Sequence, residues 1–177
     1  MDNVKIEPKM LRGTVTAPPS KSAAHRAIIA AALSGGECTV SNLAMSADMI
    51  ATIGGIRALG HKCSVNEKKG YAKFASSKKS KKQGITEIDC GESGSTLRFL
   101  IPVSLVGGGE IRFTGRGRLM QRPMEPYFDM FAEKGIACER GEDYIKLCGS
   151  LQGGVFKIAG NVSSQFITGL LFALPLL

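Results

Sequence analysis

The sequence contains no tryptophan, only two histidines and three tyrosines among its 177 residues. With so few histidines, a histidine-based metal site is not expected. No aromatic residue is interleaved with the basic cluster at 78–82, so a stacking surface for single-stranded nucleic acid is not expected either. There is no apolar run long enough to span a membrane, and the first residues lack the profile of a signal or transit peptide. These absences predict a cytoplasmic protein that binds neither nucleic acid nor membrane.

Disulfides are also not expected. The five cysteines, at positions 38, 63, 90, 138 and 148, are odd in number, scattered, and form no CxxC pair. Most lie within apolar segments that have the pattern of strands. The pattern predicts reduced, buried thiols rather than a disulfide framework or a zinc site.

What the chain does have is a formal net charge of +8 and 44% hydrophobic residues. The hydrophobic content is enough for a core within one domain, and the charge favours anionic partners. Part of the charge is concentrated in Lys78-Lys79-Ser80-Lys81-Lys82. We expect this cluster to be a solvated loop between two strands.

A helix with positive charge at its start is predicted after Pro18-Pro19. Ser20 can cap it, and residues 23–33 are almost all helix formers. A helix N-terminus already carries about half a positive charge, so Lys21 and Arg26 are locally unfavourable there. An anion held by the helix N–H groups and the two cations would account for them. The alternative is a surface helix whose Lys21 and Arg26 point to water.

A duplicated unit is visible in the order of the predicted elements. The sequence predicts helices over 21–34, 46–59, 94–106, 123–134 and 163–175, and strands over 37–42, 61–66, 71–75, 85–90, 110–114, 136–140, 143–148 and 154–159. The order helix, strand, helix and then three strands occurs twice. Gly60 and Gly135 end the second helix of each unit. The repeat is therefore a supersecondary unit and not a short solenoid repeat.

The repeat places three hydroxyl-rich turns at equivalent helix starts. They are Ser20-Lys21-Ser22, the turn 91–96 and the turn 160–165. A single serine at such a position is usually only a cap. Three in equivalent positions would direct their N–H groups towards a common place, which predicts a site for a multiply anionic ligand.

Four motifs occur together and in order: Pro19-Ser20-Lys21-Ser22 with Arg26, the turn 91–98, Arg122-Pro123-Met124, and Ser163-Ser164-Gln165-Phe166. The set resembles the 5-enolpyruvylshikimate-3-phosphate synthase family. The resemblance implies an α/β fold of repeated βαβαββ units, with helices inside and sheets outside, in an inside-out barrel of two similar domains. By this resemblance, residues 1–17 are a strand segment of the other, largely absent domain. Residues 18–177 form the substrate-binding domain, with two units and the start of a third, so that the domain is incompletely represented.

The resemblance also implies a reaction. The enolpyruvyl group of phosphoenolpyruvate would move to the 5-hydroxyl of shikimate 3-phosphate by addition and elimination, releasing phosphate and requiring no metal or organic cofactor. Lys21, Gly94 and Arg122 would contact phosphoenolpyruvate, with Gly94 bringing backbone N–H groups close to it. Arg98 matches a family arginine and is interpreted as an internal brace.

The second substrate would be held by the other motif residues. By resemblance, Ser22 and Arg26 bind the shikimate carboxylate, with Arg26 offering a planar fork. Ser163 and Ser164 would bind the 3-phosphate at their helix start. Gln165 would lie against the ring and against phosphoenolpyruvate.

No catalytic residue is assignable, since the family's acid/base carboxylates lie in the missing C-terminal portion of the enzyme. The chain alone is therefore expected to be inactive. One departure from the family pattern is Phe99, where many members have proline; it leaves glyphosate sensitivity open.

Three alternatives remain at this stage. UDP-N-acetylglucosamine enolpyruvyl transferases typically have Lys-Asn where this chain has Lys21-Ser22, and a reactive cysteine near 112–122, where this chain has none. A non-catalytic basic module would bind nucleic acid through 78–82 and 112–122. An RNA-end-processing enzyme would need a nucleophilic histidine, for which His25 and His61 have no supporting context.

Overall fold

The computed structural model describes residues 4–5, 7–10, 12–76 and 84–177, so the basic cluster at 78–82 lies outside the described residues. The helices are α1 (Lys21–Leu33), α2 (Ala47–Ala58), α3 (Gly94–Leu105), α4 (Glu125–Glu133) and α5 (Ser164–Ala173), with the short 3-10 helices η1 (Leu119–Gln121) and η2 (Leu174–Leu176). The strands are β1 (Cys38–Val40), β2 (Cys63–Asn66), β3 (Tyr71–Phe74), β4 (Thr86–Asp89), β5 (Gly109–Thr114), β6 (Ala137–Arg140) and β7 (Tyr144–Gly149).

The strands form two sheets, in the orders β1-β3-β2 and β4-β5-β7-β6. In the second sheet β4 runs parallel to β5, and β7 pairs antiparallel with both β5 and β6. Together with α3 and α4, this sheet is a βαβαββ unit. The first sheet has the same order and directions as strands β5, β7 and β6 of the second sheet, because β3 pairs antiparallel with both β1 and β2. The duplication predicted from the sequence is therefore confirmed.

The strand predicted over 154–159 does not form, and that prediction was wrong. By its place in the repeat, this segment corresponds to β4, whose parallel partner β5 follows the next helix. After α5 the chain makes only the 3-10 turn η2. With no neighbouring strand, the N–H and C=O groups of 154–159 have no ladder to join.

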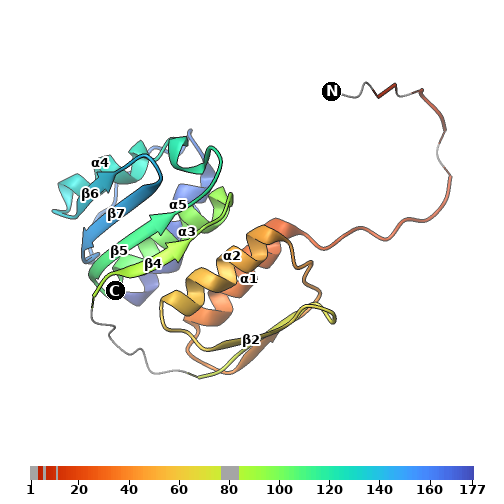
Figure 1. Cartoon of the computed structure of the whole chain (residues 1–177), viewed down its shortest axis with the longest axis horizontal. Coiled ribbons are helices and arrows are strands. Elements are labelled where there is room, and N and C mark those ends of the chain that lie inside the picture. Colours follow the sequence, from red (N-terminus) through yellow and green to blue (C-terminus); the bar gives the residue numbers. More distant parts are fainter. Residues whose placement is uncertain (1–3, 6, 11, 77–83) are drawn as a thin grey trace.

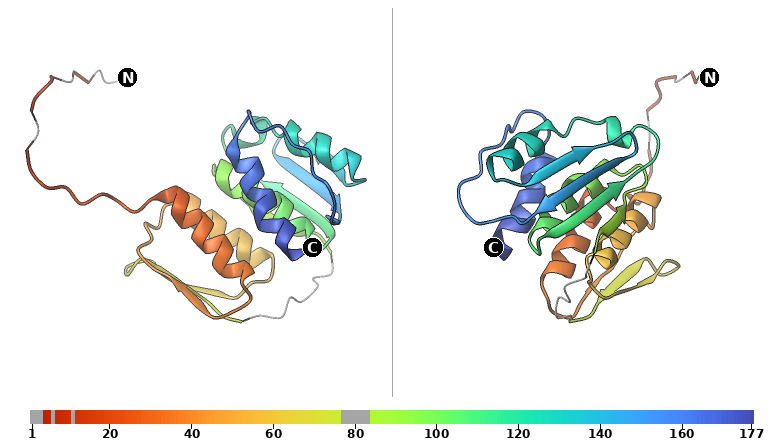
Figure 2. Two further views of the ribbon diagram at one scale, coloured as in Figure 1. Left: turned by 180° about the vertical axis from the view of Figure 1, so that it is seen from behind. Right: turned by 60° about the vertical axis from the view of Figure 1, so that its left-hand side comes forward.

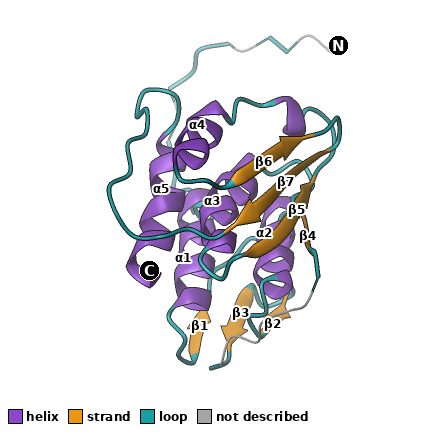
Figure 3. Cartoon of the chain, turned by 90° about the vertical axis from the view of Figure 1, so that its left-hand side faces the viewer, coloured by secondary structure: helices purple, strands orange, loops and turns teal. Residues whose placement is uncertain are grey.

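Four helices lie side by side between the sheets. Figure 3 shows α1, α2, α3 and α5 packed together, while α4 lies beside β6. Their facing sides bury Ile28, Ile53, Leu100 and Phe166, each 3% exposed or less. The view of Figure 2 from behind shows α5 running along α3. This packing agrees with the expectation of helices inside and sheets outside.

The residues ahead of α1 extend away from this body (Figure 1). None of those that the structure describes belongs to a helix or strand. Within the described ranges, no helix combines the length and the apolar content needed to cross a membrane.

Helix α3 contains a proline whose effect is compensated by α4 and α5. Pro102 has no N–H, so the carbonyl of Arg98 loses its helical donor. The hydroxyl of Tyr127, from α4, donates to that carbonyl and is shared with the carbonyl of Phe166 in α5, both at 2.8 Å. Gly169 allows the close approach, since a Cβ there would lie 2.5 Å from the Arg98 oxygen. This contact fixes the start of α5 against α3.

All five cysteines are free. Cys90 is fully buried, and burial raises the pKa of its thiol. Cys148 is exposed, however, so the expectation of buried thiols is wrong for this residue. It lies in β7, where alternate side chains point away from the core.

Candidate functional site

The start of α1 carries an ion pair to α2. Ser20 caps α1, its Oγ accepting from the backbone N of Ala23 at 3.3 Å. The ammonium of Lys21 pairs with the carboxylate of Asp48, in the first turn of α2, although the Lys21 side chain remains 58% exposed. The alternative of a lysine that only points to water is therefore wrong. Lys21 is held at the place where two helices begin, and the ion pair leaves more than half of its side chain exposed.

Arg26 lies one turn further along α1, against α3. Its guanidinium is 5.3 Å from the centre of the Phe99 ring and donates to the carbonyl of Ser22 at 3.0 Å. Phe99, the departure from the family pattern, is thus the surface on which Arg26 rests. Ser22 itself is exposed.

At the start of α3, a glycine and an arginine come close together. Ser93 caps the helix, its Oγ accepting from the backbone N of Thr96 at 3.2 Å. A Cβ on Gly94 would lie 2.5 Å from Nη1 of Arg122, so only glycine lets this guanidinium approach the helix start. Arg140 donates to the carbonyl of Arg122 at 2.7 Å and fixes the loop that carries it.

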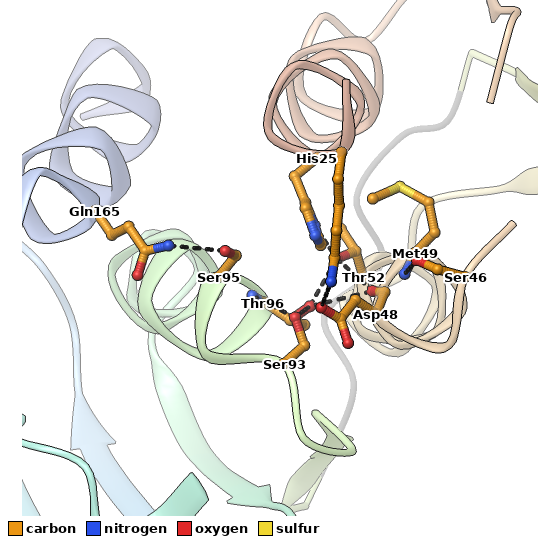
Figure 4. Close-up of polar contacts among 10 residues, drawn as sticks. His25, Ser46, Asp48, Met49, Thr52, Ser93, Ser95, Thr96 and Gln165 are labelled. Atoms are coloured by element: carbon orange, nitrogen blue, oxygen red, sulfur yellow. Dashed lines mark hydrogen bonds and ion pairs between the residues drawn. The ribbon is translucent and has the colours of Figure 1, made fainter. Parts of the chain in front are cut away.

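Gln165 connects the start of α5 to α3. Its Oε1 accepts from Nη1 of Arg98 at 2.8 Å. Its Nε2 donates to Oγ of Ser95, also at 2.8 Å (Figure 4). The two bonds set the orientation of the amide. Ser163 caps α5 by accepting from the backbone N of Gln165 at 3.3 Å. Ser164 is exposed, and its carbonyl accepts from the hydroxyl of Thr168.

Two arginines, Arg98 and Arg122, lie beside the start of α3. Burial lowers the pKa of Arg98, and the nearby charge of Arg122 lowers it further. Among the described residues, no carboxylate forms an ion pair with either guanidinium. Two cations beside a helix N-terminus form an environment that favours a bound anion.

The predicted residues thus fall into two groups. Gly94, Arg122 and Gln165 gather around the start of α3, while Lys21 and Arg26 lie at the start of α1. Within the part of the chain that the structure describes, no three His, Cys, Asp or Glu side chains come together as a possible metal site.

Sequence reasoning missed several residues that join these groups. Asp48 holds Lys21, Ser95 holds Gln165, and a buried line of polar groups runs from His25 through Thr52 to the start of α3 (Figure 4). One signal was present in the sequence for the first of them. Ser46 and Asp48 open α2 as a cap and an acidic first-turn residue, a fourth polar helix start beside the three singled out.

Known proteins are similar to this chain in sequence and in fold. The family model described as EPSP synthase (3-phosphoshikimate 1-carboxyvinyltransferase) matches residues 6–177. A 3-phosphoshikimate 1-carboxyvinyltransferase of Clostridium perfringens (strain SM101 / Type A) is 49% identical over 179 residues, and one of Clostridium novyi (strain NT) is 45% identical over 185 residues. Each match covers 100% of this chain but 42% of the relative, so the chain spans less than half the length of these proteins.

The fold is shared as well. The solved structure of EPSP synthase from Acinetobacter baumannii superposes with a TM-score of 0.74 at 25% sequence identity, covering 91% of this chain and 38% of that one. This similarity confirms the α/β fold expected from the sequence. The chain belongs to the EPSP synthase family.

Proposed function

We propose that this chain is the N-terminal, substrate-holding portion of an enzyme that transfers the enolpyruvyl group of phosphoenolpyruvate to shikimate 3-phosphate, releasing phosphate. The observation that carries the proposal is the start of α3. There, Arg98 and Arg122 lie beside a helix N-terminus at which Gly94 has no side chain to cover the backbone N–H groups. Among the described residues, no carboxylate forms an ion pair with either arginine. Such a place suits one of two anionic substrates that must be held side by side.

In this proposal Lys21, Gly94 and Arg122 hold phosphoenolpyruvate. Lys21 offers a point charge to the phosphate, and it exchanges its ion pair with Asp48 for one with the ligand. The backbone at Gly94 provides N–H groups, with the Arg122 guanidinium lying directly beside them. The amide of Gln165, oriented by Arg98 and Ser95, faces the same ligand.

Shikimate 3-phosphate would be held by the remaining positions. Ser22 and Arg26 bind its carboxylate, and the planar fork of Arg26 is kept in place by the ring of Phe99. Ser163 and Ser164 bind the 3-phosphate at the start of α5, where Ser164 is exposed and the helix N-terminus favours a negative charge. Gln165 contacts the ring.

The domain assignment belongs to the same proposal. Residues 18–177 are the substrate-binding domain, and residues 1–17 pair with a second domain, supplied by the rest of the enzyme together with the acid/base groups. Family membership favours this function over the sister transferase acting on UDP-N-acetylglucosamine and over a basic nucleic-acid module.

Calorimetry with shikimate 3-phosphate tests the assignment, on the wild-type chain and on Arg26→Ala and Ser163→Ala. Both variants should lose roughly tenfold or more in affinity, because each removes a hydrogen bond to a charged group. Arg112→Ala is the control, since Arg112 lies in β5 against the ring of Tyr144. Equal affinity in all four proteins would undo the site assignment. Binding to any polyanion, with steep salt dependence and no preference for shikimate 3-phosphate, would favour the nucleic-acid module.

A further inference from the structure

A continuous line of buried polar groups joins α1, α2 and α3. Nδ1 of His25 lies 2.7 Å from Oγ1 of Thr52, and Oγ1 of Thr52 lies 2.7 Å from Oγ1 of Thr96. Thr96 in turn donates its hydroxyl to Oγ of Ser93 at 2.7 Å. Figure 4 shows these four side chains in contact, and each residue is 1% exposed or less. The line ends at the cap of α3, next to Gly94.

The shortest contacts give this line its direction. The carbonyl of Asp48 is a second acceptor for both threonines, but it lies further away, 3.1 Å from Oγ1 of Thr52 and 3.4 Å from Oγ1 of Thr96. When the single hydroxyl hydrogen of Thr96 is used on Ser93 at 2.7 Å, Thr52 must donate to Thr96. Thr52 has then used its own hydrogen, so the N–H of His25 Nδ1 must donate to Thr52. Satisfying the three short contacts together therefore requires the Nδ1–H form of His25.

The surroundings of His25 are consistent with a neutral ring carrying a single N–H. Burial lowers its pKa to about 4, with Asp48 opposing this effect and Lys21 and Arg26 adding to it. The edge of the ring meets Phe99, and Nε2 is buried without a hydrogen-bond partner in the described structure. The hydrogen is thus needed on Nδ1, where an acceptor exists.

At the other end of the line, the hydroxyl of Ser93 can still donate a hydrogen bond. Oγ of Ser93 accepts from both the hydroxyl and the backbone N–H of Thr96. Its own hydrogen has no acceptor among the described residues, and at 1% exposure water has little access to it. A buried hydroxyl hydrogen without an acceptor is unfavourable. A ligand oxygen at the start of α3, beside Gly94 and Arg122, would remove that cost.

We propose that the Ser93 hydroxyl donates to an anionic oxygen of the ligand at the start of α3, and that His25 is a positioning residue that keeps this hydroxyl directed outward through Thr52 and Thr96. The inference rests on the proposed function, in which that ligand is phosphoenolpyruvate. If the hydrogen bonds had the opposite direction, Ser93 would donate its hydroxyl hydrogen to Thr96. It would then present only a lone pair to the ligand, and a lone pair repels an anion.

The first test is spectroscopic and needs no ligand. Nitrogen-15 NMR of the chain near neutral pH distinguishes the two neutral forms of His25. We expect the Nδ1–H form in the wild type and a mixture of forms in Thr52→Val, which keeps the shape of the side chain but removes the hydroxyl. A wild-type His25 in the Nε2–H form overturns the inference, whatever the chain binds.

The second test is titration with phosphoenolpyruvate, followed through the backbone amides of 93–95. Ser93→Ala should bind about tenfold more weakly. Thr52→Val should fall between Ser93→Ala and the wild type, and Thr52→Ser should restore binding. The matched control is Ser104→Ala, a buried hydroxyl of the same helix that donates to the Ile101 carbonyl. Thermal melting confirms that each variant is folded.

The outcomes separate this inference from the proposed function. If the wild type binds and both Ser93→Ala and Thr52→Val bind as tightly, the role of the polar line is refuted and the proposed function stands. If the wild type responds to neither phosphoenolpyruvate nor shikimate 3-phosphate, the proposed function fails and the ligand role of Ser93 fails with it. The NMR result then decides the direction of the line independently.

Discussion

Acid should destabilise this protein through His25. In the folded chain burial lowers the pKa of His25 from 6.5 to about 4, whereas in the unfolded chain the ring keeps its ordinary value. As the pH falls below about 6.5, the unfolded state therefore binds a proton that the folded state does not. The stability present above that pH is lost progressively until about pH 4. At about 1.4 kcal/mol per pKa unit, the full loss is about 3 kcal/mol.

His25→Asn isolates this contribution. The Asn Nδ2 can still donate to Thr52, but the side chain does not titrate. We expect the free energy of unfolding, measured by urea denaturation, to fall about 1.5 kcal/mol more in the wild type than in the variant between about pH 6.5 and 5. Carboxylates titrate in both proteins and cancel in the difference, as does any pH-independent cost of the smaller side chain. Parallel pH profiles for the two proteins would refute the reasoning.

Four further predictions concern the helix layer and the site. Gly169→Ala should lower the free energy of unfolding by about 2 kcal/mol or more, because its Cβ would lie 2.5 Å from the Arg98 carbonyl oxygen. In Gly94→Ala the new Cβ meets only the end of the Arg122 side chain. This variant should therefore leave urea denaturation nearly unchanged but weaken phosphoenolpyruvate binding. Tyr127→Phe should cost about 2 kcal/mol by the same assay, because two buried carbonyls lose their shared donor, and an unchanged midpoint would contradict this. The isolated chain should release no phosphate when phosphoenolpyruvate and shikimate 3-phosphate are supplied together. Measurable phosphate release would contradict the assignment of the acid/base groups to the missing portion.

The sequence predicted the local elements well because helix and strand periods are local properties. The cap at Ser20, the glycine turns and the alternating strands lie where the pattern indicated. The segment 154–159 shows where this reasoning stops. Its alternation is that of a strand, but a strand forms only with a neighbour, and the pattern of one segment does not show whether its neighbour is present.

The candidate site was predictable only in part, for a related reason. Lys21 and Arg26 stood out because their charge conflicts with a helix start, and the repeat aligned Gly94 and Ser163 with them. The partners Asp48, Ser95 and Thr52 lie far from these residues in sequence, and only helix packing brings them into contact. Their own segments carry no signal of those pairings.

Pro102 affects how the helices come apart as well as how they pack. The Arg98 carbonyl, which Pro102 leaves without a helical donor, accepts from a hydroxyl of α4 that also donates to a carbonyl of α5, so one shared donor joins the three helices. Opening α5 alone would disturb the bond on α3, and unfolding α4 would release both carbonyls. We therefore expect these helices to open as one cooperative unit, with matching protection from amide hydrogen exchange across α3 and α5. Gln165 would then lose its orientation only in openings that also loosen the interior of α3.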